Sequence, residues 1–318
     1  MLRQMLSPPA LNAPSAWPCW QAWNELADRL APALGSPLSR LDTLDTLHEV
    51  ADQLMHLGRQ HPDVAIFHLV HAPCVDLQRY SVTHALHTAW LMSLIAQRKD
   101  WGPTDERTGV LAALSMNLSI TQLQSDLATQ VEPLSPVQRE AIEHHPTESR
   151  WILEALGVDN ADWLDAVEQH HEQPDGTGYP RGLTRLHTMA DALRTCDVLG
   201  AKLSPRSSRP GLMSSRAAAE IFRHRSAGYF GATLIRELGL YPPGSLVELS
   251  SGEVAVVLRR SRDPMTPDVV VLSDGLGRPA TSLMRCATSR APGRHIVRAS
   301  ARQDCRAWID LPMLFSLA

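Results

Sequence analysis

The chain has 318 residues, of which 44% are hydrophobic and 20% are charged, so it is long and apolar enough to bury a substantial core. Its formal net charge of -4 argues against a general attraction to nucleic acid polymers or to anionic membranes. No apolar run approaches the roughly 20 residues that span a bilayer, and the five cysteines form no Cys-x-x-Cys pair, so we expect a folded cytoplasmic protein with reduced thiols.

The first part of the chain, residues 1–70, is predicted to be a Pro-rich lead followed by a helical preface. Asp42 stands where a helix cap is expected. After it, apolar residues recur at helical spacing, namely Leu44, Leu47, Ala51, Leu54 and Met55.

Residues 71–240 keep a helical pattern and are predicted to form one all-helical domain. Short breaks with Gly, Pro or Asp separate the helices, and His145 precedes Pro146 at one such break. The predicted helices cover residues 81–97, 106–118, 136–143, 147–156, 160–172, 187–203 and 214–238.

After residue 240 the pattern changes from helical spacing to alternation. Segments 246–249 and 254–258 alternate and are joined by a Gly-containing turn, which predicts a hairpin. Segments 269–272 and 295–297 are further strand candidates. We therefore expect a mainly α protein with a small antiparallel β module over residues 241–318.

Four histidines and one aspartate are candidate site residues. His171 lies on the apolar face of its helix, and His170 is its neighbour, so the two imidazoles can converge on a metal. Asp197 lies among apolar residues of the next long helix, where a buried carboxylate needs a cation or several donors. His84 and His145 stand on or beside other helices. Taken singly, each histidine has an ordinary alternative as a hydrogen-bonded structural residue.

Taken together, these positions resemble the HD-GYP branch of the HD phosphohydrolases, a family with an all-helical bundle core that hydrolyses cyclic di-GMP at a two- or three-metal centre. The resemblance covers most of residues 77–240 and continues into the β module. The matching segments are Tyr80 to His84, Glu143 to Pro146, His170 to Glu172, Asp175 to Pro180 and Thr195 to Val198.

The resemblance implies a role for each matching position. It implies metal ligands at His84, His145, His170, His171 and Asp197. The namesake loop is Gly178, Tyr179 and Pro180. Arg206 and Arg209 match basic positions that hold the substrate phosphates, with exposed loop arginines as an equal alternative.

The departure from the family is equally specific. Met116 and Asn117 stand where the family has its His-Asp pair, and Ser119 and Ile120 replace the following Gly-Lys. Tyr80 replaces the glutamate of the three-metal members. The lost aspartate is the one that bridges two metals, and two cations about 3.5 to 4 Å apart repel each other without it. A thioether and a neutral amide are poor substitutes.

Three functions therefore stay open. We favour a degenerate HD-GYP protein that binds cyclic di-GMP, a related nucleotide or a protein partner, with little or no activity. The first alternative is a metal-dependent cyclic di-GMP phosphodiesterase. The second is a pure interaction scaffold whose Tyr179 loop contacts another signalling protein, such as a diguanylate cyclase. The cofactor is expected to be one divalent metal (Fe, Mn, Zn or Ni) or none.

Overall fold

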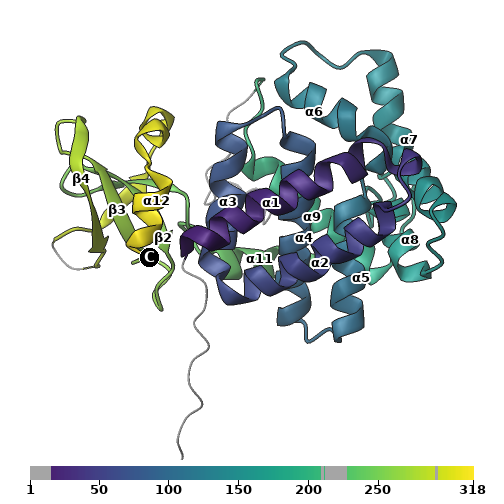
Figure 1. Cartoon of the computed structure of the whole chain (residues 1–318), viewed down its shortest axis with the longest axis horizontal. Coiled ribbons are helices and arrows are strands. Elements are labelled where there is room, and N and C mark those ends of the chain that lie inside the picture. Colours follow the sequence, from purple (N-terminus) through teal and green to yellow (C-terminus); the bar gives the residue numbers. More distant parts are fainter. Residues whose placement is uncertain (1–15, 209–210, 212–227, 291–292) are drawn as a thin grey trace, which may run out of the picture.

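A computed structural model of the chain describes residues 16–208, 211, 228–290 and 293–318. It consists of a helical body and a small sheet that lies at one end of that body (Figure 1). The predicted fold class, mainly α with a C-terminal antiparallel module, is confirmed. No helix of the described ranges is long and apolar enough to cross a membrane.

The helical body is built from a run of short and medium helices. These are α1 (Ala16–Gly35), η1 (Pro37–Ser39), α2 (Thr43–Gln60), α3 (Pro62–Val75), α4 (Tyr80–Arg98), α5 (Pro103–Ser115), η2 (Leu118–Ile120), α6 (Thr121–Thr129), α7 (Pro136–Ala155), α8 (Ala161–Gln169), α9 (Thr188–Leu203) and α11 (Gly228–Leu238). Helices α1, α3 and α6 were not predicted. The predicted helix 214–238 is described only from Gly228 onward, and the rest of it lies outside the described residues.

Helix α4 forms the centre of the body. Every residue from Tyr80 to Ala96 is buried, because the helix is largely apolar or small on all sides and other helices cover it. Trp90 is 1% exposed and packs edge-on against Trp23 of α1 at a centroid distance of 6.4 Å. The centre of the body therefore joins the preface helices to the predicted HD-type helices.

Helix α7 corrects one prediction. The sequence predicts a break at His145 and Pro146, but α7 continues through Pro146 to Ala155. Proline has no N–H to donate to the carbonyl four residues earlier, and here the Nδ1 of His145 lies 2.6 Å from that carbonyl, the oxygen of Ile142. A capping box at Ser135 and Gln138 starts the helix. The side chain of His145 therefore fills the gap that the proline leaves.

The C-terminal sheet is antiparallel, with strand order β4-β3-β2-β1-β5. Its strands are β1 (Leu246–Leu249), β2 (Val254–Arg259), β3 (Asp268–Ser273), β4 (Pro279–Ala287) and β5 (Ile296–Ala299). Leu246 pairs with Val256 across the predicted hairpin. Strand β4 was not predicted, because it is an edge strand with mostly exposed or half-buried side chains and lacks a strong apolar alternation.

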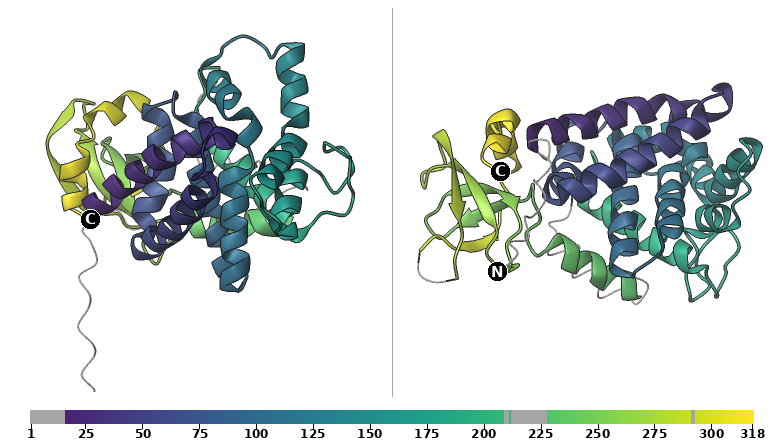
Figure 2. Two further views of the ribbon diagram at one scale, coloured as in Figure 1. Left: turned by 45° about the vertical axis from the view of Figure 1, so that its right-hand side comes forward. Right: turned by 60° about the horizontal axis from the view of Figure 1, so that its bottom comes forward.

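The sheet packs against the preface helices (Figure 2). After η4 (Gln303–Trp308), the last helix, α12 (Leu311–Ser316), places Phe315 against Trp20 of α1 and Phe67 of α3, at centroid distances of 5.6 and 5.2 Å. One apolar cluster continues from α1 through the helical body into β1, β2 and α12. The division of the chain at residues 70 and 240 stays a prediction.

Candidate metal centre

Three histidines meet where α7 and α8 approach each other. His145 comes from α7, and His170 and His171 follow the last turn of α8. One ring nitrogen from each lies within 4.8 Å of the others. His145 and His170 are buried, whereas His171 is half-buried and so forms the accessible side of the group. The structure therefore brings together three of the predicted site residues.

The tautomers of two of these histidines follow from their backbone partners. His145 Nδ1 lies 2.6 Å from the Ile142 carbonyl, and His170 Nδ1 lies 2.6 Å from the Val167 carbonyl. Since a carbonyl oxygen only accepts, both Nδ1 atoms carry the proton. Each Nε2 atom then carries a lone pair and no proton, and the two Nε2 atoms face each other at 3.1 Å.

Two facing lone pairs at this distance need a cation between them. Burial lowers the pKa of His145 to about 3 and also lowers the pKa of His170 below its ordinary value, so a proton is a poor occupant at neutral pH. A metal ion bound at about 2.0 to 2.1 Å from each imidazole nitrogen fits the 3.1 Å spacing. Backbone carbonyls that hold Nδ1–H are the usual outer partners of ligating histidines. The donor set therefore fits one metal.

His84 and Asp197 form a separate pair beside this group. His84 Nε2 lies 2.8 Å from Asp197 Oδ1, and both side chains are buried. Burial alone would raise the pKa of Asp197, but the hydrogen bond with His84 and the nearby His171 and His170 hold it below its ordinary value. The carboxylate is therefore charged and already bound to a histidine.

Tyr80 and Arg206 continue from His84 toward the surface. The Tyr80 ring is stacked on His84 at a centroid distance of 5.5 Å and an angle of 7°. The Arg206 guanidinium lies 5.2 Å from the Tyr80 ring centroid, and its Nη2 donates to the tyrosine hydroxyl at 3.3 Å. Arg206 Nε has no partner among the described residues. Arg209 lies outside the described residues.

The Gly178-Tyr179-Pro180 loop folds back over the histidines. The Tyr179 ring stacks on His171 at a centroid distance of 4.7 Å, and its backbone N–H donates to the His171 carbonyl at 3.2 Å. A Cβ at Gly178 would lie 2.5 Å from the Cα of Glu172, which only glycine avoids. The loop therefore covers the half-buried side of the histidine group.

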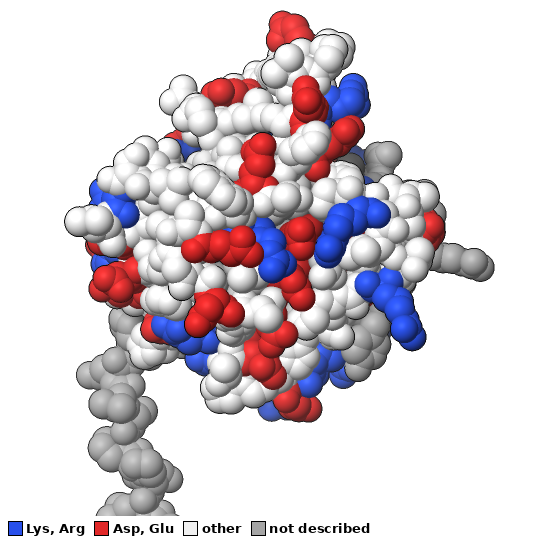
Figure 3. Space-filling model, turned by 90° about the vertical axis from the view of Figure 1, so that its right-hand side faces the viewer, with Lys and Arg blue, Asp and Glu red and all other residues white. Residues whose placement is uncertain are grey.

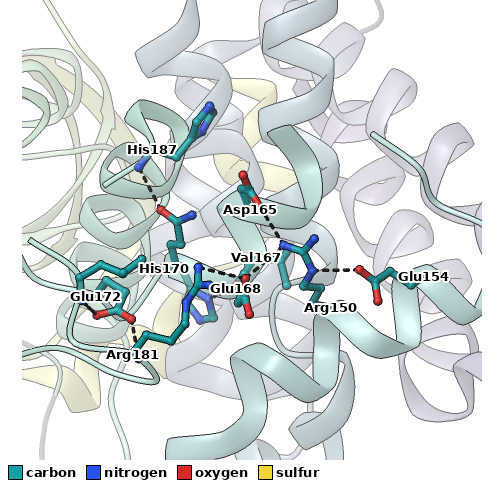
Figure 4. A network of polar contacts seen from close by, with 11 residues as sticks. Arg150, Glu154, Asp165, Val167, Glu168, His170, Glu172, Arg181 and His187 are labelled. Carbon is teal, nitrogen blue, oxygen red and sulfur yellow. Dashed lines mark hydrogen bonds and ion pairs between the residues drawn. The ribbon is translucent and has the colours of Figure 1, made fainter. Parts of the chain in front are cut away.

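Glu172 holds this loop in place. Its carboxylate is fully buried and accepts the backbone N–H groups of Arg181 and Leu183 at 2.6 and 2.8 Å. Figure 4 shows the Glu172 carboxylate beside Arg181, at the edge of a network that continues through Glu168 to Arg150. The sequence motif includes Glu172, but sequence reasoning gave it no role.

The positions of the lost His-Asp pair directly follow α5, which ends at Ser115. Met116 is 1% exposed and belongs to the apolar core, and Asn117 is half-buried. Ser119 Oγ donates to the backbone carbonyl of His145 at 3.1 Å. Its N–H donates to Ser149 Oγ at 3.2 Å. Ser119 therefore ties this segment to α7 at the histidine, a role that the sequence did not suggest.

The outer face of this region carries side chains of both charge signs. Acidic and basic side chains are interspersed there (Figure 3). Arg150, for example, forms ion pairs with three carboxylates, those of Glu154, Asp165 and Glu168, at 2.9, 2.7 and 3.1 Å. Such a face gives no general attraction to a polyanion, in agreement with the net charge.

The model of the HD domain family matches residues 64–234. The chain is 29% identical over 237 residues to the cyclic di-GMP phosphodiesterase PA4108 of Pseudomonas aeruginosa. The matched region is 72% of this chain and 56% of PA4108, so the chain spans about half the length of that relative. The solved HDG"Y"P protein Bd1817 of Bdellovibrio bacteriovorus superposes with a TM-score of 0.55 at 13% identity, covering 71% of the chain and 73% of that structure.

Proposed function

The chain belongs to the HD domain family, and on this premise we propose that it is a catalytically degenerate HD-GYP-type protein that binds cyclic di-GMP without hydrolysing it at enzymatic rates. The similarity to a cyclic di-GMP phosphodiesterase supports the choice of ligand. Proteins with the same fold need not share an activity, so the function depends on the residues of the site itself.

The observation that carries this proposal is the absence of a bridging carboxylate at the lost pair. Met116 is an apolar core residue, and Asn117 offers no negative charge. The remaining carboxylate, Asp197, is bonded to His84. Two cations side by side would therefore lack charge compensation, whereas three neutral imidazoles suffice for one ion. Imidazole ligands suit Fe, Ni and Zn, and the donor set does not select among them.

Arg206 is the group that we assign to a ligand phosphate. It stacks over Tyr80 next to the His84–Asp197 pair, and its Nε lacks a partner within the described part of the chain. A guanidinium with free donors recognises phosphate in a fixed geometry. On this assignment, Arg206 and the histidine group hold a phosphodiester, while the lack of a second metal prevents efficient attack on it.

A cyclic di-GMP phosphodiesterase is the second candidate. The five retained ligand positions, four histidines and Asp197, favour it, together with the similarity to PA4108. In this case one metal and the remaining groups activate water. Turnover separates this candidate from the first, since both predict binding.

The test is equilibrium binding of cyclic di-GMP to the whole chain, measured by calorimetry with turnover followed in parallel. Arg206→Ala should raise Kd by about tenfold to a hundredfold, as expected for a hydrogen bond to a charged group. Arg290→Ala, in the β module where the arginine pairs with Asp263, is the matched control and should bind as the unmodified chain does. Absence of binding by the unmodified chain, or equal affinity after Arg206→Ala, would reject the proposal.

A further inference from the structure

A second cavity lies at the other end of α5 and α8 from the histidines. Its volume is ≈ 530 Å³, within the range of about 300 to 1,000 Å³ that is typical of small-molecule sites. One wall comes from α2 with Leu44 and His48, and another from α5 with Arg107 and Leu111. Trp163 of α8 also lines the cavity and is 3% exposed.

One wall of this cavity lies outside the part of the chain that matches the HD domain family. The family match begins at residue 64, after the end of α2, whereas α5 and α8 lie within it. The cavity is therefore made where the preface meets the family core.

The lining contains apolar, polar and charged side chains. Arg107 donates from Nε and Nη2 to Asp52 at 2.7 and 3.0 Å, so its charge is already compensated. The other charged residue of the lining, Asp159, is exposed and solvated. An anion gains little in such a cavity, because the compensated cation is not available to it.

His48 contributes an imidazole ring to the lining of this cavity. Its ring lies edge-on to Trp163 at a centroid distance of 5.8 Å, and its Nδ1 is shielded from solvent without a partner among the described residues. Burial and the nearby Arg107 lower the pKa of His48, so the neutral ring has one donor and one acceptor. Because solvent does not reach Nδ1, a ligand in the cavity can hydrogen-bond to His48 only at Nε2, which is not among the buried unpartnered atoms.

A hydrogen bond from Trp163 links the cavity to the end of α5, and α8 leads from the cavity to the histidine centre. Trp163 Nε1 donates to Ser115 Oγ at 2.8 Å, and Ser115 directly precedes Met116. Helix α8, which begins beside the cavity, ends at Gln169 before His170. A ligand that shifts Trp163 therefore acts on helices that lead to the centre.

We propose that this cavity binds an uncharged, planar heteroaromatic compound of nucleoside size. Its aromatic and aliphatic walls suit a flat apolar ring, and its compensated charges favour an uncharged ligand. His48 provides hydrogen bonding for a ring heteroatom. Binding of this compound requires neither a metal nor cyclic di-GMP.

The test is titration of ¹⁵N-labelled protein with adenosine or guanosine, observed through the tryptophan indole N–H signals. The chain has eight tryptophans, and Trp163→Phe identifies the signal of Trp163. We expect a nucleoside to shift this signal. Ribose 5-phosphate, which has a charge but no aromatic ring, should leave it unchanged.

Filling the cavity provides the control. Leu44→Trp, or Thr104→Trp at the exposed mouth, should raise the Kd of the nucleoside by at least about tenfold. Leu41→Trp is the matched variant, since Leu41 is fully exposed and does not line the cavity. The proposal is overturned if neither nucleoside shifts the Trp163 signal, if ribose 5-phosphate shifts it equally, or if both filled variants keep full affinity. Because no metal or cyclic di-GMP is used, this failure is distinct from failure of the proposed function.

Discussion

Replacement of Glu172 tests how the loop over the histidine centre is held. The buried carboxylate accepts two backbone N–H groups, from Arg181 and Leu183. A hydrogen bond to a charged group contributes about 1.5 to 3 kcal/mol. Glu172→Ala removes both bonds, so at the lower figure for each bond we expect a loss of about 3 kcal/mol in the free energy of unfolding.

Glu172→Gln keeps the shape but turns one acceptor into a donor that faces an N–H group. We expect it to cost about 1.5 to 3 kcal/mol and to speed hydrogen exchange of the Arg181 and Leu183 amides at least about tenfold. Urea denaturation measures the first effect and hydrogen exchange by NMR measures the second.

Glu168→Gln, on α8 and four residues before Glu172, is the matched control. Its carboxylate pairs with Arg150 and Arg181 near the surface, and such pairs contribute about 0 to 1 kcal/mol. If Glu172→Gln left both the stability and the exchange of the loop amides unchanged, the carboxylate would not be what holds the loop.

Two further expectations concern the loop glycine and pH. Gly178→Ala should lower the free energy of unfolding by more than about 2 kcal/mol, measured by denaturation, because the new Cβ would overlap backbone atoms. Gly35→Ala is the control, because the space around Gly35 is open, and it should cost less than about 0.5 kcal/mol. Equal effects of the two substitutions would contradict the packing argument. Burial lowers the pKa of His68 and of His71 to about 3, so these residues bind protons near pH 6.5 only in the unfolded chain. Stability should therefore fall between pH 7 and 5.5, by about 1 kcal/mol for each, in urea denaturation with a chelator present; a flat profile would refute this.

Much of the fold follows from the sequence where the apolar pattern is regular. Strand β1 has the predicted bounds, α4 is one residue longer than predicted at each end, and α9 begins one residue later than predicted. The resemblance to HD-GYP proteins, which rests on motifs rather than periodicity, is also confirmed. Propensity rules failed at Pro146, since they do not foresee that a histidine side chain can replace a missing backbone donor.

The candidate site was only partly accessible to such reasoning. Motif spacing identified His145, His170 and His171, which the structure brings together. It did not identify Ser119 or Glu172, because their roles depend on backbone groups brought close by the fold. The metal-binding and substrate-binding roles of all these residues stay predictions.

Metal content measured together with cyclic di-GMP turnover tests the central claim most directly. We expect at most one tightly bound divalent metal per chain and hydrolysis far below ordinary enzymatic rates. Met116→His with Asn117→Asp should raise metal content, and activity should also require Ser119→Gly and Ile120→Lys. Two metals per unmodified chain, with turnover at the ~1 s⁻¹ or faster that is typical of enzymes, would contradict the degenerate assignment and favour a phosphodiesterase.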